Sequence, residues 1–165
     1  MRFFNTLTRS LEEFHEIQKG KIGLYTCGPT VYDFPHIGNY RSYVFEDLVK
    51  RFFLFLGFRV NHVMNITDID DKTIRKANET GMALAEVTRK YIDAFHADLR
   101  ILNILPADVY PRATEHIPEM LQLISRLLEK GFAYEKDGSV YFAIDRFCKQ
   151  VRWYTEARCR AKKEV

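Results

Sequence analysis

The side chains best suited to nucleotide chemistry belong to a short segment, His36-Ile37-Gly38-Asn39, that directly follows Pro35. A histidine ring nitrogen and an asparagine amide can each donate a hydrogen bond to a phosphate oxygen. A glycine lets an adenine ring lie close against the backbone, because it has no Cβ. A helical pattern begins here, so the free N–H groups of a helix N-terminus would also face an anion. The alternative is an ordinary helix start with an exposed histidine, since four residues of this kind also occur together by chance.

Cys27 is a second candidate, because a thiolate is both a nucleophile and a zinc ligand. It follows a short apolar run, residues 22–25. A single cysteine at the end of a strand is usually a small buried residue, so its position alone predicts no metal site. The other cysteines, Cys148 and Cys159, form no C-x-x-C pair, and an odd number favours a reducing compartment over a disulfide framework.

A third cluster combines a hydroxyl with several carboxylates in the run Thr67-Asp68-Ile69-Asp70-Asp71-Lys72. Carboxylates are ligands for Mg²⁺. The simpler interpretation is a capped helix start, with Thr67 or Asp68 as the cap and with Asp70 and Asp71 favoured by the helix dipole. Two of the three carboxylates are better explained by capping than by a Mg²⁺ site.

The elements that must position these residues form a βαβ unit. The apolar run 22–25 predicts a buried strand, and residues 59–65 predict the next one. Between them an apolar face recurs at helical spacing, and Gly57 is expected to end that helix. The members of this face are Ile37, Tyr40, Val44, Leu48, Phe52 and Phe55. Such strands are parallel with a right-handed crossover, and ligands bind outside their carboxyl ends, where the first two candidates lie.

The rest of the chain is predicted to be mainly helical, with one hairpin through Lys136-Asp137-Gly138. From Phe147 onward no periodicity is visible. The expected helices span residues 71–79, 84–102 and 115–130, and the hairpin strands span 132–134 and 140–144.

Length and composition fit one compact domain, or one domain with the start of a second. The chain has 165 residues, 47% of them apolar, and a formal charge of +3 that is compatible with an anionic partner without requiring one. The longest apolar stretch, residues 52–58, is too short to cross a bilayer, and the N-terminus lacks a secretory apolar run. We therefore expect a cytoplasmic protein with no membrane partner.

Three segments together, residues 25–33, 36–39 and 65–72, resemble the cysteinyl-tRNA synthetase family. These are class I aminoacyl-tRNA synthetases with a Rossmann-type catalytic domain. Residues 102–106, 111–114 and 138–142 continue the resemblance in the same order, so that it covers residues 1 to about 147. The fold class that it implies is α/β, the first half of a parallel Rossmann sheet followed by the start of an α+β connective insertion.

The resemblance also implies roles for the nucleotide segment. His36, Ile37, Gly38 and Asn39 would bind ATP, and His36 and Asn39 would act in catalysis. Asn39 stands where the family signature has a histidine, and its amide can still donate to a phosphate.

For the amino acid, the resemblance implies a pocket that includes Gly28, Thr30 and Thr67. His96, on the predicted helix 84–102, is a further candidate to face this pocket, whereas His62 and His116 are expected to be structural or solvated. Cys27 matches the first of four zinc ligands in the family. Zinc stabilises a cysteine thiolate in a way that a serine hydroxyl cannot copy, so such a site selects cysteine without editing.

The expected activity is that of an aminoacyl-tRNA ligase. The family activates L-cysteine with ATP and Mg²⁺ to cysteinyl-adenylate and transfers it to tRNA(Cys), and we expect a monomer. The predicted organisation is the N-terminal half of the catalytic domain at 1–112, the start of the insertion at 113–147 and a divergent basic tail at 148–165. On this view the chain is truncated before the other zinc ligands. Two alternatives stay open: an inactive nucleotide-binding remnant, and part of a related cysteine ligase of thiol-cofactor biosynthesis.

Overall fold

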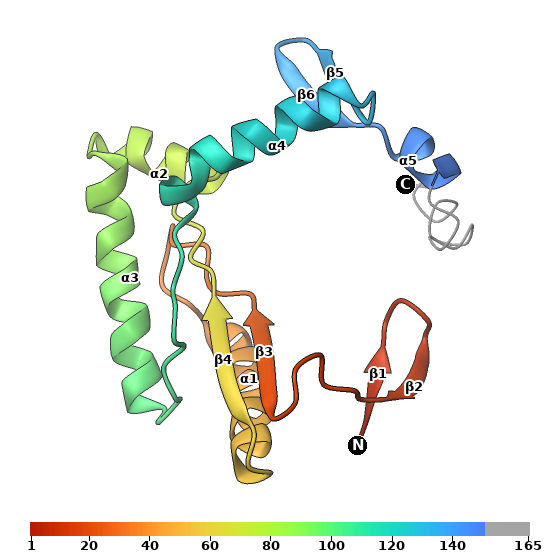
Figure 1. Cartoon of the computed structure of the whole chain (residues 1–165). Helices are drawn as coiled ribbons and strands as arrows, with labels where there is room; N and C mark the ends of the chain where they lie inside the picture. The colour runs from red at the N-terminus through yellow and green to blue at the C-terminus, as the bar shows by residue number, and fades with distance from the viewer. Residues whose placement is uncertain (151–165) are drawn as a thin grey trace. The chain divides into compact units, whose positions relative to one another are not determined.

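The computed structural model describes the backbone of residues 1–150 and the side chains of residues 1–147. The expected tail, residues 148–165, therefore lies outside the described residues, apart from the backbone of 148–150. The chain divides into two compact units, Met1–Glu115 and His116–Val165. The expected boundaries at residues 112 and 147 stay predictions. The elements, in chain order (Figure 1), are β1 (Arg2–Asn5), β2 (Ser10–Glu13), β3 (Lys21–Thr26), α1 (Ile37–Phe55), β4 (Arg59–Met64), α2 (Asp71–Thr80), α3 (Leu84–Ile101), the 3₁₀ turn Ala113–His116, α4 (Ile117–Glu129), β5 (Ala133–Lys136), β6 (Ser139–Phe142) and α5 (Ile144–Gln150).

The centre of the first unit is the parallel pair β3 and β4, which confirms the predicted βαβ unit. The paired residues at the two ends are Lys21 with Arg59 and Thr26 with Met64. Residues 109–112 run parallel to β4 along its other edge, although they form only isolated bridges. These bridges join Val63 to Val109 and Ile66 to Arg112. β4 is therefore the central strand of a parallel arrangement, as an α/β fold requires.

Successive side chains of β3 and β4 point to opposite faces, and the described residues of the first unit cover only one of these faces. The buried side chains are Ile22, Thr26, Val60, His62 and Met64. The alternate positions are exposed: Lys21, Gly23, Tyr25, Arg59 and Asn61. Figure 1 shows α1 behind the two strands, on the covered side.

α1 has the predicted length, but it buries a different face from the one its apolar spacing suggests. Gly57 has φ +85° and follows the end of the helix, as predicted for a C-terminal glycine. The buried residues of α1 are Tyr43, Lys50 and Phe53. The apolar stripe from the sequence is mostly exposed, for example 61% at Leu48 and 86% at Phe55.

Three apolar clusters form the core of the first unit. One joins the strand-end loops to α2 and α3 through residues such as Val31, Ile66 and Tyr91. Another packs α1 and β4 against α3, with Phe95 fully buried. The third joins Ile22, Phe53 and Val60.

One hairpin and one helix were not predicted. The hairpin of β1 and β2 pairs Arg2 with Glu13 and Asn5 with Ser10, and it packs on α1 through a contact between the rings of Phe3 and Phe53. Its turn contains no glycine, and Arg9 takes the positive φ of 55° that a glycine or asparagine usually supplies. The helix α5 begins at Ile144, where the sequence predicts the end of a strand.

The second unit contains α4, the hairpin of β5 and β6, and α5. The hairpin is confirmed, with an antiparallel register from Ala133–Phe142 to Lys136–Ser139. Asp137 and Gly138 both have positive φ, as a two-residue hairpin turn requires. Within the described residues, no helix is long and apolar enough to span a membrane.

Candidate functional site

The loops that leave β3 and β4 are joined beyond the ends of the strands. Thr30 and Thr67 form a parallel bridge. The backbone amide of Val31 donates to the backbone oxygen of Thr67 at 3.1 Å, and the backbone amide of Thr67 donates to the backbone oxygen of Pro29 at 3.0 Å. Two residues that the sequence analysis assigned to the amino-acid pocket are thus direct neighbours, although they are 37 positions apart in the sequence.

Gly28 is required at this junction by close packing. A Cβ atom at this position would lie 1.9 Å from the backbone oxygen of Asn65. Any side chain would therefore push the loop away from the end of β4. The amide of Gly28 also donates to the Asn65 Oδ1 atom, at 3.4 Å.

His36 and Asn39 cap the N-terminus of α1 reciprocally. The Nδ1 atom of His36 accepts from the Gly38 amide at 3.1 Å, and the Oδ1 atom of Asn39 accepts from the His36 amide at 3.1 Å. This is the geometry of a capping box, with a histidine in the place of the usual serine or threonine. The helix start that the sequence analysis treated as the alternative is therefore formed by the same residues.

The cap fixes which atoms stay free for a ligand. A backbone amide can only donate, so the Nδ1 atom of His36 must be the unprotonated acceptor and the neutral ring carries its hydrogen on Nε2. By the same argument, the Asn39 oxygen faces the His36 amide and its NH₂ group points elsewhere. Within the described residues neither Nε2 of His36 nor Nδ2 of Asn39 has a hydrogen-bond partner. A Cβ at Gly38 would lie 2.9 Å from the His36 ring, so this glycine makes room for the histidine.

These donors border a cavity of about 270 Å³ at the carboxyl ends of the strands. It is lined by Gly28, Pro29, Thr30, Tyr32, Asp33, Phe34, Pro35, His36, Asn39, Tyr43 and Lys72. Four of the sequence-predicted residues therefore share one cavity: Gly28, Thr30, His36 and Asn39. Burial, with smaller effects from Glu46 and Cys27, raises the pKa of Tyr43 to about 12. Its hydroxyl thus stays protonated at neutral pH.

Lys72, for which the sequence pattern predicts no role, brings a positive charge to this cavity. Its Nζ atom lies 4.8 Å from the centre of the Tyr32 ring, and among the described residues it forms no ion pair. Lys72 lies in the first turn of α2, where a positive charge opposes the helix dipole. This unfavourable placement is the feature of the sequence that could have indicated a functional role for Lys72.

The acidic cluster is arranged differently from the prediction. The cap of α2 is Asp70, whose carboxylate accepts from the amides of Lys72 and Thr73, so the assignment of the cap to Thr67 or Asp68 was wrong. Asp68 is buried and accepts instead from the amide and the hydroxyl of Thr114. The Asp68 carboxylate is therefore occupied by hydrogen bonds from Thr114, which follows residues 109–112.

His96 does not line this cavity. Its ring packs edge-on against Tyr110, with 4.8 Å between the ring centres. Burial and the nearby Arg100 lower the pKa of His96, so the ring is held neutral. Ile37, Gly38 and Thr67 also lie outside the lining, although each is adjacent in sequence or by hydrogen bonding to residues that form it.

Cys27 is exposed, with a free thiol. Among the described residues, no group of three or more histidine, cysteine or acidic side chains is placed to hold a metal ion. Protein zinc sites need three or four ligands, so the described residues do not form one on their own.

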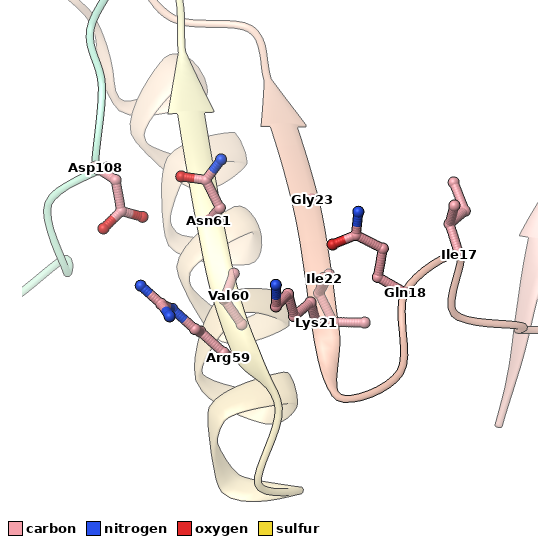
Figure 2. Close-up of a pocket in the computed structure, with 9 residues that line it drawn as sticks. All are labelled: Ile17, Gln18, Lys21, Ile22, Gly23, Arg59, Val60, Asn61 and Asp108. Atoms are coloured by element: carbon pink, nitrogen blue, oxygen red, sulfur yellow. The ribbon is translucent and has the colours of Figure 1, made fainter.

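A larger cavity, of about 540 Å³, lies near the amino ends of the strands on the open face of the sheet. Figure 2 shows its polar lining, in which Arg59 and Asn61 of β4 and Lys21 of β3 lie between Asp108 on one side and Gln18 on the other. None of the sequence-predicted site residues contributes to it. Since ligands of parallel sheets bind at the carboxyl ends of the strands, the smaller cavity is the candidate site.

The sequence matches a family model described as the class I (C) tRNA synthetase catalytic domain over residues 13–164, which extends beyond Phe147. A cysteine–tRNA ligase of Chlamydia muridarum is 55% identical over 145 residues, covering 87% of this chain and 30% of that protein. One of Pyrococcus horikoshii is 49% identical over 147 residues, covering 89% of this chain and 31% of that protein. The chain thus spans about 30% of the length of the curated relatives it matches.

Solved structures show the same fold. A Mycobacterium tuberculosis methionyl-tRNA synthetase in complex with methionyl-adenylate aligns with a TM-score of 0.62 and 23% identity, covering 69% of this chain and 23% of that one. A LeuRS of Agrobacterium radiobacter K84, in a ternary complex with tRNA and LeuAMS, aligns with a TM-score of 0.62 and 22% identity, covering 73% and 16% of the two chains. These alignments confirm the predicted α/β fold class.

Proposed function

Because the chain belongs to the family of class I (C) tRNA synthetase catalytic domains, we propose that it forms one side of a site where cysteine is activated with ATP. The observation that carries this proposal is the reciprocal cap of α1. It leaves the Nε2–H group of His36 and the NH₂ group of Asn39 as donors beside a cavity that Gly28 and Thr30 also line. Donors fixed by the backbone in this way suit the oxygens of a phosphate chain.

The proposed reaction is adenylate formation. A carboxylate oxygen of L-cysteine attacks the α-phosphorus of ATP, and the bond from that phosphorus to the bridging oxygen breaks. Pyrophosphate leaves with the electron pair, and cysteinyl-adenylate remains. In the complete ligase a hydroxyl of the terminal adenosine of tRNA(Cys) then takes the cysteinyl group, and AMP leaves. Such a reaction depends on positioning and on neutralising charge, to which Mg²⁺ bound with the ATP contributes.

In this proposal the residues of the chain have distinct tasks. His36 and Asn39 bind phosphate oxygens, and Ile37 and Gly38 shape the helix start that holds them. Thr30 and Thr67, joined backbone to backbone, border the amino acid together with Gly28. Cys27 would bind zinc only together with ligands from beyond the described residues.

The test is an ATP titration of the isotopically labelled chain, followed by NMR, with two variants of Asn39. Asn39→Asp keeps the oxygen that accepts from the His36 amide but loses the NH₂ donor, so we expect the melting temperature to be retained and ATP to bind at least about tenfold more weakly. Asn39→Ala loses the cap as well, so both properties should fall. Equal ATP affinity in the wild type and Asn39→Asp would contradict the proposal.

A second measurement separates a ligase from a nucleotide-binding protein. Because the chain spans about 30% of the length of its relatives, ATP binding without catalysis is the second candidate function. Pyrophosphate exchange into ATP that depends on L-cysteine supports the ligase. ATP binding without such exchange supports the second candidate.

A further inference from the structure

We infer that Asn65 is a positioning residue for this site, which holds the loop carrying Cys27 and Gly28 and orients the hydroxyl of Thr67. This inference rests on the proposed function for the identity of the ligand, whereas the contacts themselves do not depend on it. Asn65 follows β4 directly, and its half-buried side chain lies between the ends of the two strands.

One side chain makes three connections there. The Oδ1 atom of Asn65 accepts from the hydroxyl of Tyr25 at 2.9 Å and from the amide of Gly28 at 3.4 Å. The Nδ2 atom donates to the Oγ1 atom of Thr67 at 3.2 Å. The amide therefore bridges β3, the loop after it and the loop after β4.

The partners determine the orientation of the amide. The N–H group of Gly28 can only donate, so the atom facing it must be the oxygen of Asn65. The NH₂ group must then face Thr67, whose oxygen accepts from it. The hydrogen of the Thr67 hydroxyl is thereby left for an acceptor, and a carboxylate oxygen of the amino acid is such a group.

The same residue constrains the backbone around Cys27. On one side Thr26 is paired in β3, and its hydroxyl bonds the buried His62 at 2.9 Å. On the other side Gly28 is held by the side chain of Asn65 and lies against its backbone oxygen. The exposed thiol of Cys27 therefore extends from a backbone that is fixed at both neighbours.

The experiment measures amide hydrogen exchange at Gly28 by NMR in the full chain, without any ligand. We expect exchange about tenfold faster in Asn65→Ala, because one hydrogen bond is lost. Asn65→Asp keeps the acceptor and should stay within about twofold of the wild type. Tyr25→Phe is the matched control, since it removes a neighbouring bond but leaves that of Gly28. Unchanged exchange in Asn65→Ala would overturn the inference.

Two further readouts test the Thr67 connection. Thr67→Val should shift the side-chain amide proton resonances of Asn65. Unchanged resonances would overturn the claim that Asn65 orients the Thr67 hydroxyl. In a titration with L-cysteine, Asn65→Asp should bind about tenfold more weakly although Gly28 stays protected, because the Thr67 hydroxyl then donates to the new carboxylate. Wild-type affinity in Asn65→Asp would also overturn it. If the wild-type chain binds no cysteine, the proposed function fails, and the Gly28 and Asn65 resonances still decide the role of Asn65.

Discussion

His62 is a buried histidine that supports the strand carrying the candidate site. Only 2% of its surface is exposed. Its Nε2 atom bonds the Thr26 hydroxyl, its backbone amide donates to the Asp108 carboxylate at 2.7 Å, and its Nδ1 atom has no partner among the described residues. Burial lowers the pKa of His62, and the nearby Lys50 lowers it further, whereas Asp108 and Asp47 act in the opposite direction. Folding therefore favours the neutral ring.

This lowered pKa makes stability depend on pH. Between the folded pKa and the ordinary value of 6.5, the unfolded chain binds a proton at His62 that the folded chain does not. The stability that the neutral His62 ring contributes is fully present above pH 6.5, and it is lost as the pH falls toward the pKa of the folded state. We expect the free energy of unfolding of the wild type to decline below about pH 6.5. The free energy of unfolding of His62→Gln should decline less steeply over the same range. Denaturant unfolding at several pH values measures both slopes.

Other groups titrate over the same pH range, so the role of His62 is measured by the difference between the pH profiles of the wild type and His62→Gln. The pKa of His96 is also lowered by burial and acts with the same sign. Burial raises the pKa of Glu46, which acts with the opposite sign as the pH rises from 4.5. Both groups are common to the wild type and His62→Gln. Parallel pH profiles in the two proteins would show that His62 does not contribute.

At the scale of single residues, the sequence could show which side chains gather at the strand ends but not how each is held. The types of His36 and Asn39 suggest phosphate donors, yet that they cap each other depends on the ring of His36 folding against Gly38. In the sequence, Asn65 is distinguished only as a member of the segment 65–72. Its role depends on partners 40 and 37 positions away in the sequence, Tyr25 and Gly28, which no local pattern reveals.

The helix α2 depends on its N-cap, because its interior contains few favourable apolar contacts. Its buried residues are Thr73 and Ala77. The Asp70 carboxylate accepts from the amides of Lys72 and Thr73 at 2.9 Å each, and the Thr73 hydroxyl lies 2.8 Å from the Asp70 amide. Loss of this cap would leave backbone amides without partners at the helix start.

Asp70→Ala is therefore expected to lower the free energy of unfolding by about 1 kcal/mol, as for other N-caps. Asp71→Ala is the matched control, because Asp71 is exposed and lies in the first turn without bonding the cap. It should cost only a few tenths of a kcal/mol through the helix dipole. Denaturant unfolding measures both, and equal effects would show that the charge matters and the cap does not.

The periodicity of α1 shows how far element prediction can go. The 3.6-residue spacing gave the correct helix and the correct end at Gly57, because both depend on local chemistry. It did not identify the buried face, since α1 is apolar on more than one side and the described residues cover only the side with Tyr43 and Phe53. The β1–β2 hairpin was missed because Arg9, and not a glycine, occupies the turn.

The two units of the chain differ in how much apolar surface they bury. All three core clusters lie within Met1–Glu115. Among the described residues of the second unit, only Ala133 is a buried apolar residue. The apolar side chains of α4 are half-buried or exposed, with 58% of the surface of both Leu121 and Leu123 accessible. Among the described residues, those of the first unit thus contribute most of the stabilising free energy, since stability follows the apolar area buried.

We therefore expect residues 1–115 to fold alone. This segment retains every core cluster and both bonds from Thr114 to Asp68, so its free energy of unfolding should stay within about 1 kcal/mol of the whole chain. Residues 116–165 should show no cooperative transition, because the described residues of this segment bury little apolar surface and single domains of this size are only marginally stable. Thermal unfolding followed by circular dichroism measures both. Failure of 1–115 to fold would show that the first unit depends on the second for its stability, and cooperative melting of 116–165 would show that the second segment is stable by itself.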